Sequence, residues 1–232
     1  MSKQRDFQLH ALMSLIGGFA GAYSLLRCHD NFGAAQTANL IYMLEMLFGG
    51  NAQQFLLRLL GLFFYMVGIE SYVVVAHKTH WDPEKWVLVT EMICLILAGL
   101  LPLTSNLFVC LYPIFFMLAA QWSVFHGACG YNASTIFSSN NVKQFSLAIG
   151  EYCFDHKPEQ KEKAQFFGLT LLFYHIGVAA VILCYPLANH FSIWFAFIPL
   201  LFAAWIILRP AEAGSRHNIA FHSHRVAKNT GR

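Results

Sequence analysis

The longest stretch without a charged side chain constrains this sequence more than any other feature. Residues 164–208 run for 45 positions without Asp, Glu, Lys or Arg. A helix that crosses a bilayer needs about 20 mostly apolar residues, so this stretch is long enough for two such helices. Asn189 and His190 form a polar break between them. Residues 87–141 are similar, because Glu91 is the only charged residue among them. These runs predict an integral membrane protein.

Six apolar segments predict an all-α, polytopic membrane helix bundle of about six spans. An open strand cannot satisfy its backbone in lipid, so we expect each segment to be a helix. The segments are residues 7–26, 54–76, 85–103, 107–127, 164–185 and 190–208. Residues 34–49 and 134–154 mix apolar with polar side chains, and they predict amphipathic helices or re-entrant helices that enter the membrane only inside protein.

The distribution of Lys and Arg predicts the topology. If the six apolar segments span the bilayer, the inner side holds 13 of the 15 basic residues and the outer side holds Arg27 and Arg58. The positive-inside rule therefore places both termini in the cytoplasm. An eight-span alternative also keeps the termini inside, but it puts Lys78 and Lys85 outside and Lys143 within the membrane. We expect one transmembrane domain over residues 1–208, followed by a basic cytoplasmic tail over 209–232.

Several classes of function find no support in the sequence. The six cysteines are scattered without a C-x-x-C pair, and no zinc-like ligand spacing is present. No P-loop, dinucleotide fingerprint or nucleophile elbow occurs, so we expect neither an enzyme nor a bound cofactor. The tail carries too few charges for a nucleic-acid arm. The lipid bilayer is the expected partner, and Gly17-x-x-x-Gly21 would allow close packing within the chain or in a homo-oligomer.

Short strings recur in the two halves of the chain. Residues 65–69 (YMVGI) echo residues 174–178 (YHIGV), and residues 37–39 (TAN) echo residues 139–141 (SNN). The spacing between the two strings is longer in the second half, where residues 155–163 form a polar insertion. With three spans in each half, the second half would begin from the opposite side of the membrane. This pattern predicts an inverted 3+3 repeat with halves at about 7–105 and 106–208; chance similarity is the alternative.

The order of these motifs resembles the YoaK family of bacterial membrane proteins, whose function is undetermined. The matching strings are residues 17–22 (GGFAGA), 37–39, 121–123 (QWS) and 139–141. The resemblance implies a compact helical protein in the bacterial inner membrane, and it implies no reaction. The chain departs from the family pattern at Gly21, Ala38 and Trp122, where relatives tend to have Asp, Gly and Asn. If those polar groups bind a ligand in relatives, this protein is expected to bind that ligand differently or not at all.

Polar side chains inside the apolar segments are the candidates for function, because burying them in lipid costs several kcal/mol unless they find partners. We expect them to converge between the two halves as a solute or proton site. The candidates are Thr37, Asn39, Glu70, Glu91, Gln121, Asn140, Asn141 and His175. Glu70 and Glu91 would lie at similar depth on neighbouring spans, where two carboxyl groups can bind a proton between them. Helix capping, snorkelling and interhelical hydrogen bonds are the structural alternatives.

An inverted repeat frames a site between its halves, so a transporter-like protein for a small solute or ion is the function we expect. The alternative is a membrane accessory or scaffold protein that transports nothing.

Overall fold

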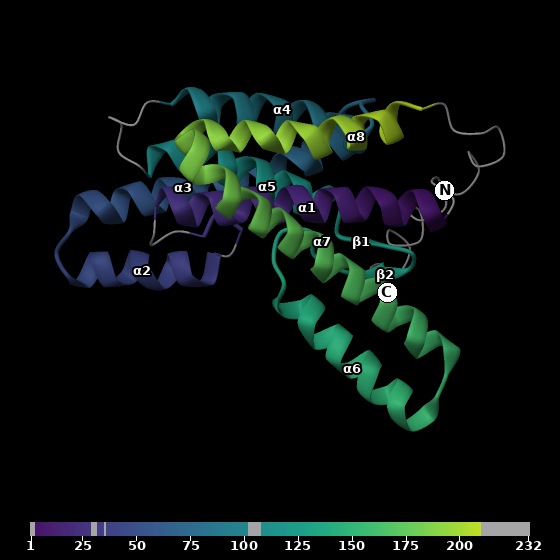
Figure 1. Ribbon diagram of the computed structural model, residues 1–232. Coiled ribbons are helices and arrows are strands. Elements are labelled where there is room, and N and C mark those ends of the chain that lie inside the picture. Colours follow the sequence, from purple (N-terminus) through teal and green to yellow (C-terminus); the bar gives the residue numbers. More distant parts are fainter. Residues whose placement is uncertain (1–2, 29–31, 35, 102–107, 210–232) are drawn as a thin grey trace, which may run out of the picture.

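The computed structural model of the chain describes residues 3–28, 32–34, 36–101 and 108–209 (Figure 1). Its α-helices are α1 (Lys3–Arg27), α2 (Gln36–Phe48), α3 (Ala52–Lys78), α4 (Pro83–Leu100), α5 (Tyr112–Val124), α6 (Ser139–Asp155), α7 (Pro158–Ala188) and α8 (Phe197–Leu208). Two 3-10 turns, η1 (Val109–Leu111) and η2 (Asn189–Ala196), precede α5 and α8. β1 (Gly127–Ala128) and β2 (Tyr131–Asn132) form a two-stranded antiparallel hairpin. The predicted all-α class is confirmed for the described residues.

Helices occupy every segment that the apolar pattern predicts, but two of them are shorter than expected. The fourth predicted segment, residues 107–127, is α-helical only between Tyr112 and Val124, because the chain turns into the β-hairpin there. The sixth, residues 190–208, begins with η2 and becomes α-helical only at Phe197. The two mixed segments contain α2 and α6 as predicted. The basic tail after Arg209 lies outside the described residues.

The helix starts follow ordinary capping chemistry. Asn51 precedes α3, and its Oδ1 accepts a hydrogen bond from the backbone N–H of Gln54 at 3.1 Å. Asp82 precedes α4, and its Oδ1 accepts from the N–H of Glu84 at 2.9 Å, with Pro83 in the first helical position. These caps fix where the chain turns between the long helices.

Within the described residues, three continuous helical stretches are long and apolar enough to cross a membrane: Lys3–Arg27, Ala52–Lys78 and Pro158–Leu208. The last of these contains α7, η2 and α8. The two remaining long apolar segments fall short, because α4 carries three charged side chains and α5 has 13 residues. The number of spans therefore remains a prediction.

The long helices run side by side. In Figure 1, α1, α3, α4, α5 and α8 follow similar directions, and α7 crosses them obliquely against α1. The short helix α2 packs on α3, and α6 packs on the first half of α7 to form a hairpin that projects from the bundle. The start of α1 and the end of α8 lie at the same end of the bundle. This placement agrees with both termini facing one side of a membrane.

The two halves exchange matching contacts through glycines. Gly68 of α3 packs on α5, where a Cβ would come within 2.5 Å of the carbonyl oxygen of Phe116. Gly177 of α7 occupies the same place in the recurring string and packs on the carbonyl oxygen of Leu15 in α1. Each half therefore has its second long helix against the first helix of the other half. Among the described residues, each half has four α-helices in sequence, and the second half also has the β-hairpin between its first two.

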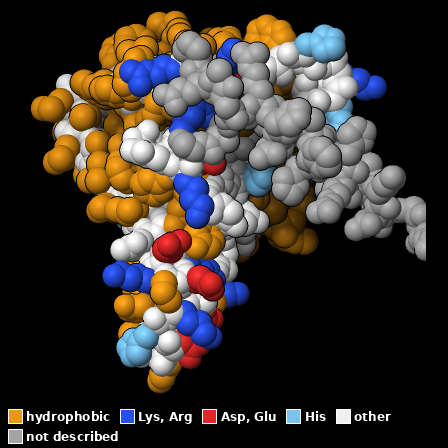
Figure 2. All heavy atoms as spheres, turned by 90° about the vertical axis from the view of Figure 1, so that its right-hand side faces the viewer, with side chains coloured by type: hydrophobic (Ala, Val, Ile, Leu, Met, Phe, Trp, Pro, Cys, Tyr) orange, Lys and Arg blue, Asp and Glu red, His pale blue; other side chains and the backbone are white. Residues whose placement is uncertain are grey.

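The outer surface of the bundle is apolar. Phe48, Leu183 and Leu187 are 85%, 72% and 85% exposed, and large aliphatic side chains cover much of α3, α4 and α8. Figure 2 views the end at which α1 begins, and it shows hydrophobic side chains on the flanks with charged groups gathered on the projecting part. A water-soluble protein rarely exposes so much apolar surface. The surface is that of a protein with lipid as its solvent.

Candidate functional site

Two asparagines hydrogen-bond to the backbone of the non-helical segments that precede α2 and α6. The Nδ2 of Asn39 in α2 donates to the carbonyl oxygen of Phe32 at 3.0 Å. The Nδ2 of Asn141 in α6 donates to the carbonyl oxygen of Ser134 at 2.7 Å, and its Oδ1 accepts from the N–H of the same residue at 3.1 Å. Both asparagines are buried, and each reaches back seven residues. The two halves thus share this detail at matching positions.

The non-helical segments held by these asparagines lie between α1 and α5. The N–H of Gly33 donates to Oγ of Ser24 in α1 at 2.7 Å, and a Cβ at Gly33 would meet Ile114 of α5 at 3.1 Å. In the second half, the backbone of Thr135 packs directly on Gly17 of α1. Non-helical backbone is tolerated at membrane depth only inside protein. Residues 33–34 and 133–136 of these segments are buried and meet that condition.

Gln121 connects α5 to α1 and to the non-helical segment that contains Thr135. It lies on α5 and is fully buried. Its Nε2 donates to the carbonyl oxygen of Met13 in α1 at 2.8 Å and to Oγ1 of Thr135 at 2.9 Å. Its Oε1 has no hydrogen-bond partner among the described residues. One side of the amide therefore holds the bundle together, and the other remains available to accept a hydrogen bond.

His10 is a further candidate site residue that was not among the eight predicted from the sequence. It lies on α1 one turn before Met13 and Ser14, is 1% exposed, and has its ring centroid 5.5 Å from that of Phe166. Neither ring nitrogen has a hydrogen-bond partner in the described part of the chain. The signal for it was present, because His10 interrupts the first apolar segment. A buried polar group without a partner costs free energy, so this imidazole is suited to bind a proton, water or solute.

Four of the eight predicted residues point away from this region. Thr37 and Asn140 are exposed on the first turns of α2 and α6, next to the buried Asn39 and Asn141. Glu70 is exposed on α3. His175 is exposed on α7, where its Nδ1 lies 2.8 Å from the carbonyl oxygen of Leu171 in its own helix. Asn39, Gln121 and Asn141 are buried, and Gln121 and Asn141 contact the neighbouring residues Thr135 and Ser134 of one segment. The convergence of the eight residues on one site, and a role for any of them in binding, stay predictions.

Glu91 lies apart from these residues. It is fully buried on α4, and neither carboxyl oxygen has a hydrogen-bond partner in the described chain. Because Glu70 is exposed, the two carboxyl groups do not form the expected pair. An unpartnered buried carboxyl is expensive, and such groups inside membrane helices often serve proton transfer. Glu91 remains a candidate for proton binding by itself.

Two arginines at the other end of α1 and the start of α3 are also buried. Nη2 of Arg27 donates to the carbonyl oxygen of Leu101 at 3.4 Å. The guanidinium of Arg58 lies 5.3 Å from the ring centre of Tyr42 and 5.0 Å from that of Phe108. Cation–π contacts of this kind stabilise a charge that has left water. No group of three or more His, Cys, Asp or Glu residues in the described ranges is arranged to hold a metal ion.

The apolar exterior, the long apolar helices and the buried non-helical segments define a helical membrane protein whose mainly apolar interior contains a few buried polar side chains. Residues 9–206 match the model of a family described as "Protein of unknown function (DUF1275)". Because the match covers most of the chain, the protein belongs to this uncharacterised family. Membership of an uncharacterised family agrees with the resemblance seen in the sequence, and the match carries no YoaK name. No curated protein and no solved structure matches the chain.

Proposed function

We propose that the protein transports a small solute or ion across the bacterial inner membrane, with six spans and both termini in the cytoplasm. In this proposal the protein is of the YoaK type, its halves are inverted repeats, and the solute passes between them. The observation that carries the proposal is the pair of buried non-helical segments between α1 and α5, each held by an asparagine in the same register. Broken helices that meet between inverted repeats form the binding sites of many secondary transporters.

The unpartnered atoms supply the chemistry for binding. Gln121 offers a carbonyl oxygen, and His10 offers a ring that donates or accepts according to its protonation state. Neither ring nitrogen of His10 has a hydrogen-bond partner among the described residues, which leaves both free to bind a ligand or a proton. A buried histidine can also couple solute movement to proton movement.

The substitution His10→Phe tests this assignment. The purified protein is reconstituted into liposomes that contain a pH-sensitive dye, and dye response and membrane current are recorded for a panel of small organic acids, amines and inorganic ions. We expect the parent protein to carry at least one of them and His10→Phe to lose about tenfold or more of the rate, as expected when a required proton carrier is removed. Thermal stability should not fall, because the imidazole nitrogens have no hydrogen bonds to lose among the described residues.

The matched control is Leu183→Ala on the exposed face of α7, which should transport at the parent rate. Parent liposomes that behave like empty liposomes across the whole panel would contradict transport. His10→Phe with the parent rate would contradict the assigned site.

A membrane accessory or scaffold protein is the second candidate, and the outward face of α2 favours it. Ile41 and Phe48 on this face are 63% and 85% exposed, and the helix packs mainly on α3. A partner helix could cover this face. Purification in mild detergent with measurement of the molecular mass would distinguish a single chain from a stable assembly.

A further inference from the structure

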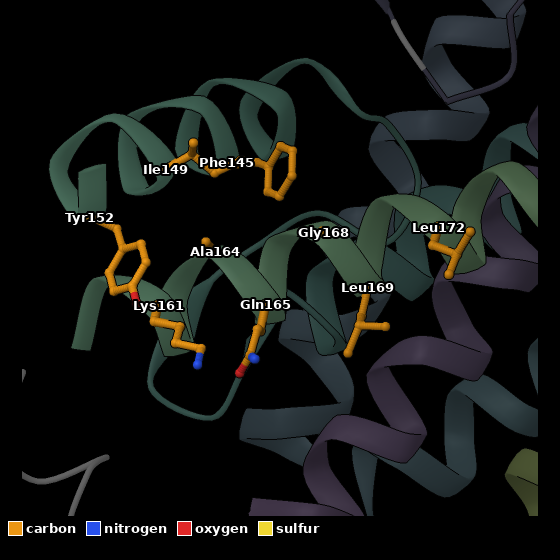
Figure 3. A pocket seen from close by; sticks show the side chains of 9 residues that line it. All are labelled: Phe145, Ile149, Tyr152, Lys161, Ala164, Gln165, Gly168, Leu169 and Leu172. Atoms are coloured by element: carbon orange, nitrogen blue, oxygen red, sulfur yellow. The ribbon is translucent and has the colours of Figure 1, made fainter. Parts of the chain in front are cut away.

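A hollow of about 390 Å³ lies between α6 and α7, in the hairpin that projects from the bundle (Figure 3). Its walls are almost entirely apolar. They are formed by Phe145, Ile149, Tyr152, Lys161, Ala164, Gln165, Gly168, Leu169 and Leu172. The residues that line the hollow all belong to α6 and α7, and none of them is a residue of the region between α1 and α5, so the hollow requires an explanation of its own.

The packing of Phe145 on Gly168 shapes this hollow. A Cβ at Gly168 would lie 2.9 Å from Cε2 of the Phe145 ring, so a larger residue there would displace the ring from the backbone of α7. Leu169 and Leu172 stay 40% and 53% exposed beside this contact. The hollow is therefore an apolar groove along the α6–α7 hairpin that is open on one side.

The polarity of the hollow changes from one end to the other. Lys161 and Gln165 lie on one face of α7, because residues four apart are neighbours on a helix surface, and Leu169 and Leu172 continue that face. Figure 3 shows the hydroxyl end of Tyr152 beside Lys161, with Phe145 and Leu172 toward the opposite end. A cation, a hydroxyl and an amide thus mark one end of an otherwise apolar surface.

Lys161 is the positive charge at this end. The ion pairs among the described residues are Arg5–Glu84 and Lys157–Asp155, and neither includes Lys161. Glu159 and Glu162 are near it in sequence, but positions two before and one after do not face the same side of a helix. Lys157, one turn earlier, has its charge paired with Asp155 at 2.7 Å.

We propose that this hollow binds one anionic phospholipid, with an acyl chain along Phe145, Leu169 and Leu172 and the phosphate beside Lys161. Along α7 the polar side chains come first and the apolar side chains follow, as the headgroup is followed by the acyl chains in such a lipid. The polar end lies toward the charged turn between α6 and α7, where a headgroup belongs, and the apolar end lies toward the bundle. This site is independent of the proposed transport.

Photocrosslinking in liposomes tests the site. A benzophenone amino acid is placed at Leu172 in the hollow or at Leu183, which is exposed on the same helix outside it. The full-length protein is reconstituted into equal parts of phosphatidylglycerol and phosphatidylethanolamine, illuminated, and weighed by intact mass spectrometry. We expect the ratio of phosphatidylglycerol to phosphatidylethanolamine adducts at position 172 to exceed that at 183 about fivefold, the factor expected for one lysine near an anionic headgroup.

The charge variants decide whether Lys161 is responsible. Lys161→Gln should reduce the adduct ratio at position 172 to the ratio at 183. Lys163→Gln removes the same charge two residues away, outside the hollow, and should leave the ratio unchanged. Both residues lie near the charged turn, so neither variant should impair folding. Equal ratios at positions 172 and 183, equal losses in both variants, or adducts with peptide instead of lipid would overturn the proposal.

Discussion

The ion pair between Arg5 and Glu84 shows how single residues tie the start of α1 to the start of α4. Nη2 of Arg5 donates to Oε2 of Glu84 at 3.0 Å, and the two side chains are 28% and 22% exposed. Burial raises the pKa of Glu84 above its ordinary value, and the Arg5 guanidinium opposes that shift. The arginine therefore favours the charged form of a half-buried carboxylate at the end of the bundle.

The first prediction concerns the pH dependence of this pair. Because the folded chain holds the Glu84 proton more tightly than the unfolded chain, the stability from this group is present at low pH and is lost as pH rises through the folded pKa. Arg5→Gln removes the opposing charge and should increase that loss. We expect a cost of about 1 kcal/mol near pH 8 and a smaller cost near pH 4.5, where a larger share of the carboxyl groups is protonated because the pKa is raised.

Thermal unfolding of the purified protein in detergent at the two pH values measures this difference. Lys3→Gln is the control, because it removes a charge from the same helix end without a partner carboxylate at hydrogen-bond distance among the described residues. An Arg5→Gln variant whose melting temperature falls equally at both pH values would contradict the electrostatic explanation.

At the scale of elements, the close approach of α7 to α1 depends on Gly177. A methyl group there would overlap the backbone carbonyl of Leu15, and neither backbone can rotate away as a side chain could. We therefore predict that Gly177→Ala destabilises the protein by about 1–3 kcal/mol, the usual cost of overpacking. Gly150 on α6 has nothing within 4 Å of the position that a Cβ would occupy, so Gly150→Ala should instead stabilise by about 0.5–1 kcal/mol.

Melting temperatures of the two alanine variants, measured side by side, test this prediction. Both changes add one methyl group to a helix, so intrinsic helix propensity favours both equally. The explanation fails if the Gly177 variant melts at or above the temperature of the parent protein.

The positions of the helices followed from the apolar segments, because lipid accepts the backbone only in that form. The positions at which the chain leaves the helix were less predictable. α5 ends at Val124 and a buried non-helical segment follows, although Ala133, Ile136 and Phe137 continue the apolar pattern. Packing on Gly17 of α1 stabilises that segment, and a contact so distant in sequence leaves no local signal.

For a related reason, the sequence predicted only some of the residues of the candidate site. Residue type indicates that a polar group is present in a span, but the register of the helix decides which side it faces. Tyr174 and Gly177 face α1, so His175 between them lies outside. His10 belongs to the face of α1 that carries Ser14 and Gly17, and it is therefore buried. Assigning these faces requires knowledge of the neighbouring helix.

At the scale of the whole molecule, the end of the bundle at which each helix terminus and turn lies predicts the membrane topology. The start of α1 and the end of α8 share one end of the bundle with the turn between α6 and α7 (Figure 1). Reporter fusions at residues 80, 158 and 232 should report the cytoplasm, and fusions at 105 and 188 should report the opposite side, because Lys and Arg favour the inner side. An external signal at residue 80 or 158 would be incompatible with six spans.

The glycine face of α1 also has a consequence for how the protein is made. Gly17, Gly18 and Gly21 pack on Thr135, Tyr174 and Phe32, and two of these three partners belong to the second half of the chain. While the ribosome is still synthesising the middle of the protein, Gly17 and Gly18 on this face of the first helix have no permanent neighbour. The first span must therefore be held by the insertion machinery or by lipid until α7 arrives, and a chain truncated before α7 would lack the contacts that complete the first half.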